Sequence, residues 1–233
     1  MLRVLVTRPE PGASRTADKL AALGYEPVLL PLTRIEPLPV ESWPVPANFS
    51  AVAIPSANAV RHAPPALLGE IAGLPAFAVG ERTGHVAAAK SLSVRDSSSG
   101  DAERLAARII GAVEPGSRVL LLCGRVRRST LEDRLTQAGL SVAALETYDT
   151  VPNLLSEHEF HEATAARPID VVLVYSAFAA EILSPRVPSL QSAVFIAISD
   201  RVAQKLPAAA GIRTMVAREP TEEAMLSILP GHD

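Results

Sequence analysis

Small hydroxylated residues recur directly after hydrophobic segments of this sequence, where a helical pattern begins. Ser56 follows the run 51–54 (AVAI), and Ser176 comes soon after the run 171–174 (VVLV). A hydroxyl in this position can cap the helix by accepting a backbone N–H, or it can contact a bound anion, because free N–H groups and the helix dipole favour negative charge. One such residue indicates only a cap, so the repetition is the informative feature.

The same kind of position occurs at the end of most predicted strands, and its residues are small, hydroxylated or basic. The candidate binding residues chosen on this basis are Thr7, Arg8, Ser56, Asn58, Gly80, Thr83, Arg125, Ser176, Ala177, Ser199 and Thr221. Ligands of open α/β sheets bind beyond the carboxyl ends of the strands. We therefore expect these residues to contact an anionic ligand.

The sequence gives little support for nucleotide binding, metal binding or nucleophilic catalysis. Neither GxGxxG nor GxxxxGK[ST] occurs, so dinucleotide or P-loop binding is not expected. His158 and His161 have helical spacing but no evident third ligand, which favours a solvated helix face over a metal site. Cys123 has no obvious histidine partner and is interpreted as a small buried residue. A nucleophilic or metal-dependent mechanism is therefore not predicted.

The composition is that of an ordinary globular chain. Of 233 residues, 48% are hydrophobic and 20% are charged, and the net charge of −3 gives no general attraction to nucleic acid or anionic membrane. A single cysteine excludes an internal disulfide and fits a reducing compartment. The opening apolar run is too short for a signal peptide, and no segment approaches the roughly 20 apolar residues of a membrane helix. We expect a soluble cytoplasmic protein.

Strand and helix patterns alternate along the chain. Strands are predicted at 2–7, 27–32, 51–55, 76–79, near 94 and at 118–122, and helices at 14–23, from about 56 to 68, 82–90 and 101–112. This alternation predicts a parallel α/β sheet, because parallel strands need a crossover that a helix usually supplies. The proline-rich segment 34–48 cannot be helical and is predicted to be a linker.

The sequence also contains a degenerate duplication. Residues 3–33 align without gaps on 118–148, pairing Val4 with Val119 and Gly24 with Gly139, and Ser56 pairs with Ser176 in a looser second part. Two similar doubly wound domains are therefore expected. The duplication leaves open whether the chain divides near 115 or whether segments are exchanged across two linkers, the second at 147–153.

Several short motifs follow one another along the chain: VLVTRP, LGYEPVLLPL, AIPSANAV, AFAVGERT, VLLLCGR, LETYDTVP, VLVYSAFAAEIL and AREPTEEAMLSIL. In this order they resemble the uroporphyrinogen-III synthase family. The resemblance implies two similar doubly wound parallel-sheet α/β domains joined by a two-stranded linker, with the active site in a cleft between them. The first domain would be discontinuous, residues 1–35 and 152–233; the second would be 36–151, with linker segments near 36–39 and 147–152.

The resemblance implies a cofactor-free, metal-free lyase of porphyrin and haem biosynthesis. Such an enzyme closes the linear tetrapyrrole hydroxymethylbilane to uroporphyrinogen III, with loss of water and inversion of the last pyrrole ring through a spiro intermediate. Tyr148 matches a linker tyrosine of the family and is predicted to act as the proton donor, or as a hydrogen-bond partner, for the departing hydroxyl. Ser56, Thr83, Ser176 and Thr221 match family positions and are predicted to contact substrate carboxylates.

The expected partner is the small polycarboxylate substrate, with no nucleic acid and no membrane. We expect a monomer that can make transient contact with the upstream deaminase. The alternative hypothesis is a non-catalytic two-lobed module that binds an anionic small ligand.

Overall fold

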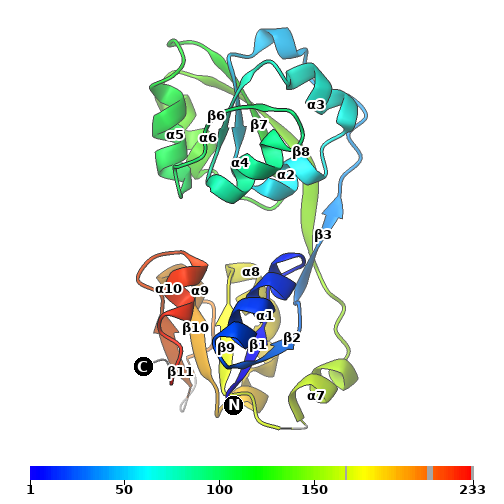
Figure 1. Ribbon diagram of the computed structural model, residues 1–233, viewed down its shortest axis with the longest axis vertical. Coiled ribbons are helices and arrows are strands. Elements are labelled where there is room, and N and C mark those ends of the chain that lie inside the picture. Colours follow the sequence, from blue (N-terminus) through cyan, green and yellow to red (C-terminus); the bar gives the residue numbers. More distant parts are fainter. Residues whose placement is uncertain (166, 209–211, 232–233) are drawn as a thin grey trace. The chain divides into compact units, whose positions relative to one another are not determined.

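The computed structural model describes residues 1–165, 167–208 and 212–231 (Figure 1). The chain divides into two compact units, one formed by Met1–Arg34 with Val151–Asp233 and the other by Ile35–Thr150. It passes from one unit to the other twice, within the neighbouring strands β3 (Thr33–Pro37) and β8 (Ser141–Pro152). No helix among the described residues is long and apolar enough to cross a membrane.

The first unit is built on a five-stranded sheet in the order β11-β10-β9-β1-β2, and its paired strands all run parallel. The strands are β1 (Arg3–Val6), β2 (Glu26–Leu29), β9 (Val171–Val174), β10 (Val194–Ala197) and β11 (Arg213–Val216). The helices are α1 (Gly12–Ala22), α7 (Glu157–Ala165), α8 (Ala177–Leu183), the 3-10 helix η2 (Ser184–Leu190), α9 (Asp200–Ala203) and α10 (Glu222–Leu226).

The second unit is built on a six-stranded sheet in the order β3-β8-β7-β4-β5-β6. Its other strands are β4 (Ala51–Ile54), β5 (Pro75–Ala78), β6 (Ser93–Asp96) and β7 (Arg118–Gly124). Its helices are the 3-10 helix η1 (Pro46–Asn48), α2 (Ala57–Arg61), α3 (Pro65–Ile71), α4 (Glu81–Ala88), α5 (Ala102–Ile110) and α6 (Thr130–Gln137). The two predominantly parallel sheets confirm the predicted α/β class.

Helices cover both faces of each sheet, so the central strands contribute to two cores. In β1, Leu5 packs with α8 and η2, whereas Val4 and Val6 pack with α1 and α10. In β7, Leu120 and Leu122 pack with α2 and α3, whereas alternate residues pack with α5 and α6. A strand buried on both faces is continuously apolar, which explains runs such as VLLLC in the sequence.

The duplicated segments are exchanged between the units. The order β11-β10-β9-β1-β2 of one sheet corresponds to β6-β5-β4-β7-β8 of the other, so each sheet joins two strands of one copy to three strands of the other copy. The paired glycines Gly24 and Gly139 also match, because both end a helix with φ of +81°. In each case the residue after glycine donates its N–H back into the last helical turn, to Leu20 or to Leu135.

Two predictions of secondary structure were wrong. The helix expected from about 56 to 68 is two helices, because Pro64 and Pro65 interrupt the backbone ladder and Pro65 begins α3. The segment 34–48, predicted to contain no helix, includes the 3-10 helix η1, which has Pro46 at its first position. The segments expected to link the domains near 36–39 and 147–152 fall largely in the paired strands β3 and β8.

Candidate active site

Each sheet has a topological switch point, where the strand order reverses from one side to the other. In the first unit the switch point lies between β1 and β9, and in the second it lies between β7 and β4. Crevices for ligands form at the carboxyl ends of such strand pairs. Thr7 and Ser176 therefore follow the strands at one switch point, and Gly124 and Ser56 are found at the other.

Tyr148 lies beside the second switch point, at a β-bulge in β8. Cys123 of β7 is paired with Glu146 and Gly124 is paired with Tyr148, so Thr147 is the extra residue. Leu145 packs into the core formed by α2 and α3, and strict alternation would send Tyr148 to the opposite face. The bulge returns the ring of Tyr148 to the face of Leu145, where it is 9% exposed.

Gly124 provides the space that the ring occupies. A Cβ built on Gly124 would lie 2.6 Å from Cζ and 3.0 Å from the phenolic oxygen of Tyr148. The next residue, Arg125, donates its backbone N–H to the carbonyl oxygen of Tyr148 at 2.9 Å. Thr147 donates its hydroxyl to the carbonyl of Ala59 in α2 at 2.8 Å, which fixes the bulge from the helix side.

Two polar side chains lie near the phenol. Burial raises the pKa of Tyr148 above its usual value, against the opposing effect of a hydrogen bond from Ser56. Ser56 also caps α2, because its Oγ accepts the N–H of Asn58 at 3.2 Å. The ring of His62 lies 6.3 Å from that of Tyr148, and burial together with Arg61 lowers the pKa of His62. Tyr148 is thus a neutral, protonated phenol at neutral pH, and His62 is a neutral neighbour.

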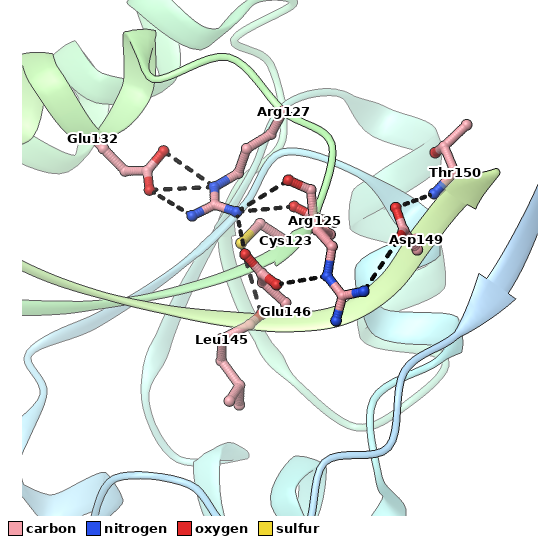
Figure 2. A network of polar contacts seen from close by, with 9 residues as sticks. Cys123, Arg125, Arg127, Glu132, Leu145, Glu146, Asp149 and Thr150 are labelled. Carbon is pink, nitrogen blue, oxygen red and sulfur yellow. Dashed lines mark hydrogen bonds and ion pairs between the residues drawn. The ribbon is translucent and has the colours of Figure 1, made fainter.

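A network of ion pairs lies at the end of β7 and beside the bulge of β8 (Figure 2). Arg125 contacts Glu146 at 3.3 Å and Asp149 at 3.4 Å. Arg127 contacts Glu146 at 2.7 Å and Glu132 of α6 at 2.9 Å. Arg127 lowers the pKa of Glu146 despite the opposing effect of burial, so this carboxylate stays ionised. The predicted binding residue Arg125 is therefore already paired with two carboxylates of the protein.

The other predicted residues of the second unit belong to α2 and α4. Asn58 accepts a hydrogen bond from Nη1 of Arg61 at 3.0 Å through its side-chain oxygen. Gly80 is the N-cap of α4 and has room beside it, since a Cβ there would meet nothing within 4 Å. Thr83 is buried in the first turn of α4 and only 6% exposed.

In the first unit, Thr7 and Arg8 are held by the protein itself. Thr7 is fully buried and donates its hydroxyl to the carbonyl of Leu173 at 2.7 Å, which ties the ends of β1 and β9 together. The guanidinium carbon of Arg8 lies 4.4 Å from the ring centroid of Tyr175. Arg8 also donates to Glu222 at 2.8 Å. Arg8 is therefore present at the switch point with its charge balanced by Glu222.

The remaining predicted residues of this unit occupy helix N-termini. Ser176 accepts the N–H of Ala179 at 3.0 Å, and Thr221 accepts the N–H of Ala224 at 3.2 Å, so both are caps. Ala177 is the first residue of α8. Ser199 precedes α9 but does not cap it, and its buried hydroxyl oxygen has no hydrogen-bond partner among the described residues.

A family model described as uroporphyrinogen-III synthase HemD matches residues 14–227. The chain belongs to the uroporphyrinogen-III synthase family. No curated protein sequence matches the chain significantly.

Two solved structures share the fold. The uroporphyrinogen-III synthetase of Helicobacter pylori is 20% identical, with 97% of each chain covered and a TM-score of 0.68. A mutant uroporphyrinogen III synthase of the extremely thermophilic bacterium Thermus thermophilus is 19% identical, with 97% of this chain and 96% of that chain covered and a TM-score of 0.59. At these identities the similarity shows the fold.

Two expectations about individual side chains are confirmed. Cys123 is buried, and desolvation raises the pKa of its thiol to about 11, so it is not a thiolate at neutral pH. His158 and His161 are exposed on α7. Within the described ranges, no group of three or more histidine, cysteine or acidic side chains could hold a metal ion.

Sequence reasoning missed several residues that surround the predicted residues at the two switch points, one in each unit. They are Glu146 and Asp149 beside Tyr148, Gly124 beneath its ring, His62 near it, and the pair of Tyr175 and Glu222 around Arg8. Glu146 and Asp149 flank the predicted tyrosine in the motif ETYD, which was a usable signal. Glu222 contacts Arg8 across 214 residues of sequence, and no local pattern indicates such a contact.

Proposed function

We propose that this chain uses Tyr148 as the proton donor in the closure of hydroxymethylbilane to uroporphyrinogen III. As a member of its family the chain is a hydro-lyase of porphyrin and haem biosynthesis that acts on a small tetrapyrrole. The observation that carries the assignment is the position of Tyr148 at the bulge beside the switch point. There the phenol is largely buried and its pKa is raised, so it holds a proton to give.

The proposed reaction starts at the terminal hydroxyl of the substrate. Tyr148 donates a proton to this hydroxyl as the C–O bond breaks, so that water leaves and an electrophilic carbon remains. The substituted carbon of the last pyrrole ring attacks it and forms a spiro intermediate. This intermediate fragments and recloses with the ring inverted, and the proton lost when the pyrrole is restored returns to the phenolate. The net change is the loss of one water.

The substrate carries acetate and propionate groups, and we propose that the carboxyl edges of both sheets bind them. Backbone N–H groups at helix N-termini and nearby hydroxyls are suited to carboxylates. The proposed contacts are Arg8, Ser56, Asn58, Gly80, Thr83, Ser176, Ala177, Ser199 and Thr221, whereas the fully buried Thr7 holds the end of β1 through its hydrogen bond to Leu173. Among them Ser199 has a buried hydroxyl without a partner in the described part of the chain, and Gly80 has open space for a ligand.

We further propose that the protein acts as a cytoplasmic monomer and receives its substrate from the upstream deaminase through transient contact. The net charge of −3 offers no general attraction that would draw it to nucleic acid or to an anionic surface. Analytical ultracentrifugation at several protein concentrations would test whether the protein is a monomer.

The test of the activity is an analysis of product isomers. Purified protein is mixed with hydroxymethylbilane, and the type I and type III rings are separated by chromatography and compared with a protein-free reaction. The proposal predicts that type III predominates with protein and type I without it. Tight binding of hydroxymethylbilane with only type I product would instead support a non-catalytic binding module.

A further inference from the structure

The bulge that aims Tyr148 is held from the opposite face of β8. With Thr147 as the extra residue, Glu146 and Asp149 both lie on the side of the sheet away from the tyrosine ring, one before the bulge and one after it. The guanidinium of Arg125 contacts both carboxylates, as Figure 2 shows. The backbone N–H of the same residue donates to the carbonyl of Tyr148. One residue at the end of β7 thus joins three residues of the bulged segment.

The charge balance of the network argues against a direct role for Arg125 in binding a polycarboxylate. The network contains two guanidinium groups, of Arg125 and Arg127, and three carboxylates, of Glu132, Glu146 and Asp149. Its formal charge is therefore −1 rather than positive. A carboxylate of the substrate would have to compete with two carboxylates that the protein already supplies to Arg125.

Arg127 secures the same segment at a second point. It joins Glu146 to Glu132 of α6 and donates to the carbonyl of Gly124 at 3.2 Å. Glu146 therefore contacts two arginines, Arg125 and Arg127. Arg125 is the one of the two that also contacts Asp149. Without Arg125, Asp149 loses the ion pair that ties the part of the bulge after Tyr148 to the end of β7.

We propose that Arg125, acting through Glu146 and Asp149, is a positioning residue that holds the bulge and thereby the phenol of Tyr148, rather than a ligand of the substrate. The inference rests on the proposed role of Tyr148. Holding a reactive group matters because a displacement of about 1 Å can cost about 10²-fold in rate.

The test compares the steady-state kinetics of Arg125→Met with those of the wild type. Methionine keeps much of the side-chain length but removes the charge. We expect kcat to fall by about tenfold or more, with KM changed by less than about twofold. Arg125→Lys keeps the positive charge but lacks the planar guanidinium, so its kcat should lie between those of Arg125→Met and the wild type. A rise in KM with unchanged kcat would overturn the proposal and make Arg125 a carboxylate ligand.

Arg134→Met is the matched control. Arg134 makes an exposed ion pair with Glu103 at 2.6 Å in the same unit, away from the bulge, and its loss should leave kcat unchanged. In a Tyr148→Phe background, Arg125→Met should have little further effect on kcat, because the group it positions is already gone. Full additivity of the two changes would contradict the proposal.

A measurement without turnover separates this inference from the proposed function. Protein labelled with ¹³C at Cζ of tyrosine gives three signals, of Tyr25, Tyr148 and Tyr175, and Tyr148→Phe identifies the relevant one. We expect the Tyr148 signal to shift or broaden in Arg125→Met and in Asp149→Asn, but not in Arg134→Met. An unmoved Tyr148 signal would overturn the positioning role. If the Tyr148 signal shifts in Arg125→Met but the wild-type protein forms no type III product, only the proposed function would be contradicted.

Discussion

Gly124 and Tyr148 lie against each other at the end of β7, and the contact is possible only because Gly124 has no side chain. A Cβ there would come within 2.6 Å of Cζ and 2.8 Å of Cε2 of the ring, closer than real Cβ atoms approach other atoms. The two residues are also register partners across the bulge. The position of the proposed proton donor is therefore set by the residue beneath it.

Gly124→Ala should displace the ring and impair the reaction. We expect kcat to fall by about 10²-fold, because the phenol has to move by about 1 Å, and the free energy of unfolding to drop by about 1–3 kcal/mol from overpacking. Enzyme kinetics and chemical denaturation measure the two effects. Gly69→Ala in α3 is the control, since nothing lies within 4 Å of its Cβ, and it should leave kcat unchanged. Wild-type kcat in Gly124→Ala would show that the ring's position does not matter.

The pH dependence of kcat should reflect the raised pKa of Tyr148. A proton donor is active in its protonated form, which is populated below its pKa. Burial raises this pKa above the usual 10.0, so activity should not decline through loss of this proton until the pH exceeds 10. A pH–kcat profile of the wild type, with the stability of the fold followed in parallel, checks this. An alkaline limb between about pH 7 and 8 that disappears in Tyr148→Phe would contradict it.

Glu222 should stabilise the first unit in a pH-dependent way. Burial alone would raise the pKa of this carboxyl, but hydrogen bonds from Lys19 and Thr16 and the charge of Arg8 outweigh burial and lower it. A lowered pKa gives a contribution that is present above the unfolded value of 4.5 and is lost as pH falls through the folded value. We expect Glu222→Gln to lower the free energy of unfolding by about 1.5–3 kcal/mol at neutral pH.

Glu223→Gln is the control for Glu222→Gln. The side chain of Glu223 is 76% exposed and forms an ion pair with Lys19, so Glu223→Gln should cost less than about 1 kcal/mol. Urea denaturation at pH 7 and at pH 4 or below measures both. The proposed role of Glu222 would be contradicted if both variants lost the same free energy of unfolding. It would also be contradicted if the loss in Glu222→Gln were as large in acid as at pH 7.

Local patterns of the sequence predicted most of the elements. The helix caps at Ser56, Ser176 and Thr221 were predictable because a cap depends on residues only two or three positions away. The helix stops at Gly24 and Gly139 share this local origin. The break at Pro64 and Pro65 was equally local, and the helical pattern was wrongly continued through it.

The surroundings of the site depend on pairing across strands, which a single sequence does not display. The bulge at Thr147 exists because of how β8 registers with β7, and the face on which Tyr148 lies follows from that register. The role of Arg125 likewise depends on Glu146 and Asp149, 21 and 24 residues away. The sequence therefore pointed to Tyr148, through the resemblance to the family, but not to the residues around it.

The most direct test of the account is the kcat of Tyr148→Phe with hydroxymethylbilane as substrate. This change removes one buried oxygen and leaves the ring beside Gly124, so the fold should persist with a similar melting temperature. The account predicts that kcat falls by about 10²-fold or more while KM stays within about twofold, because the variant lacks a proton donor and keeps the binding edges. A folded Tyr148→Phe variant with wild-type kcat would contradict the central claim.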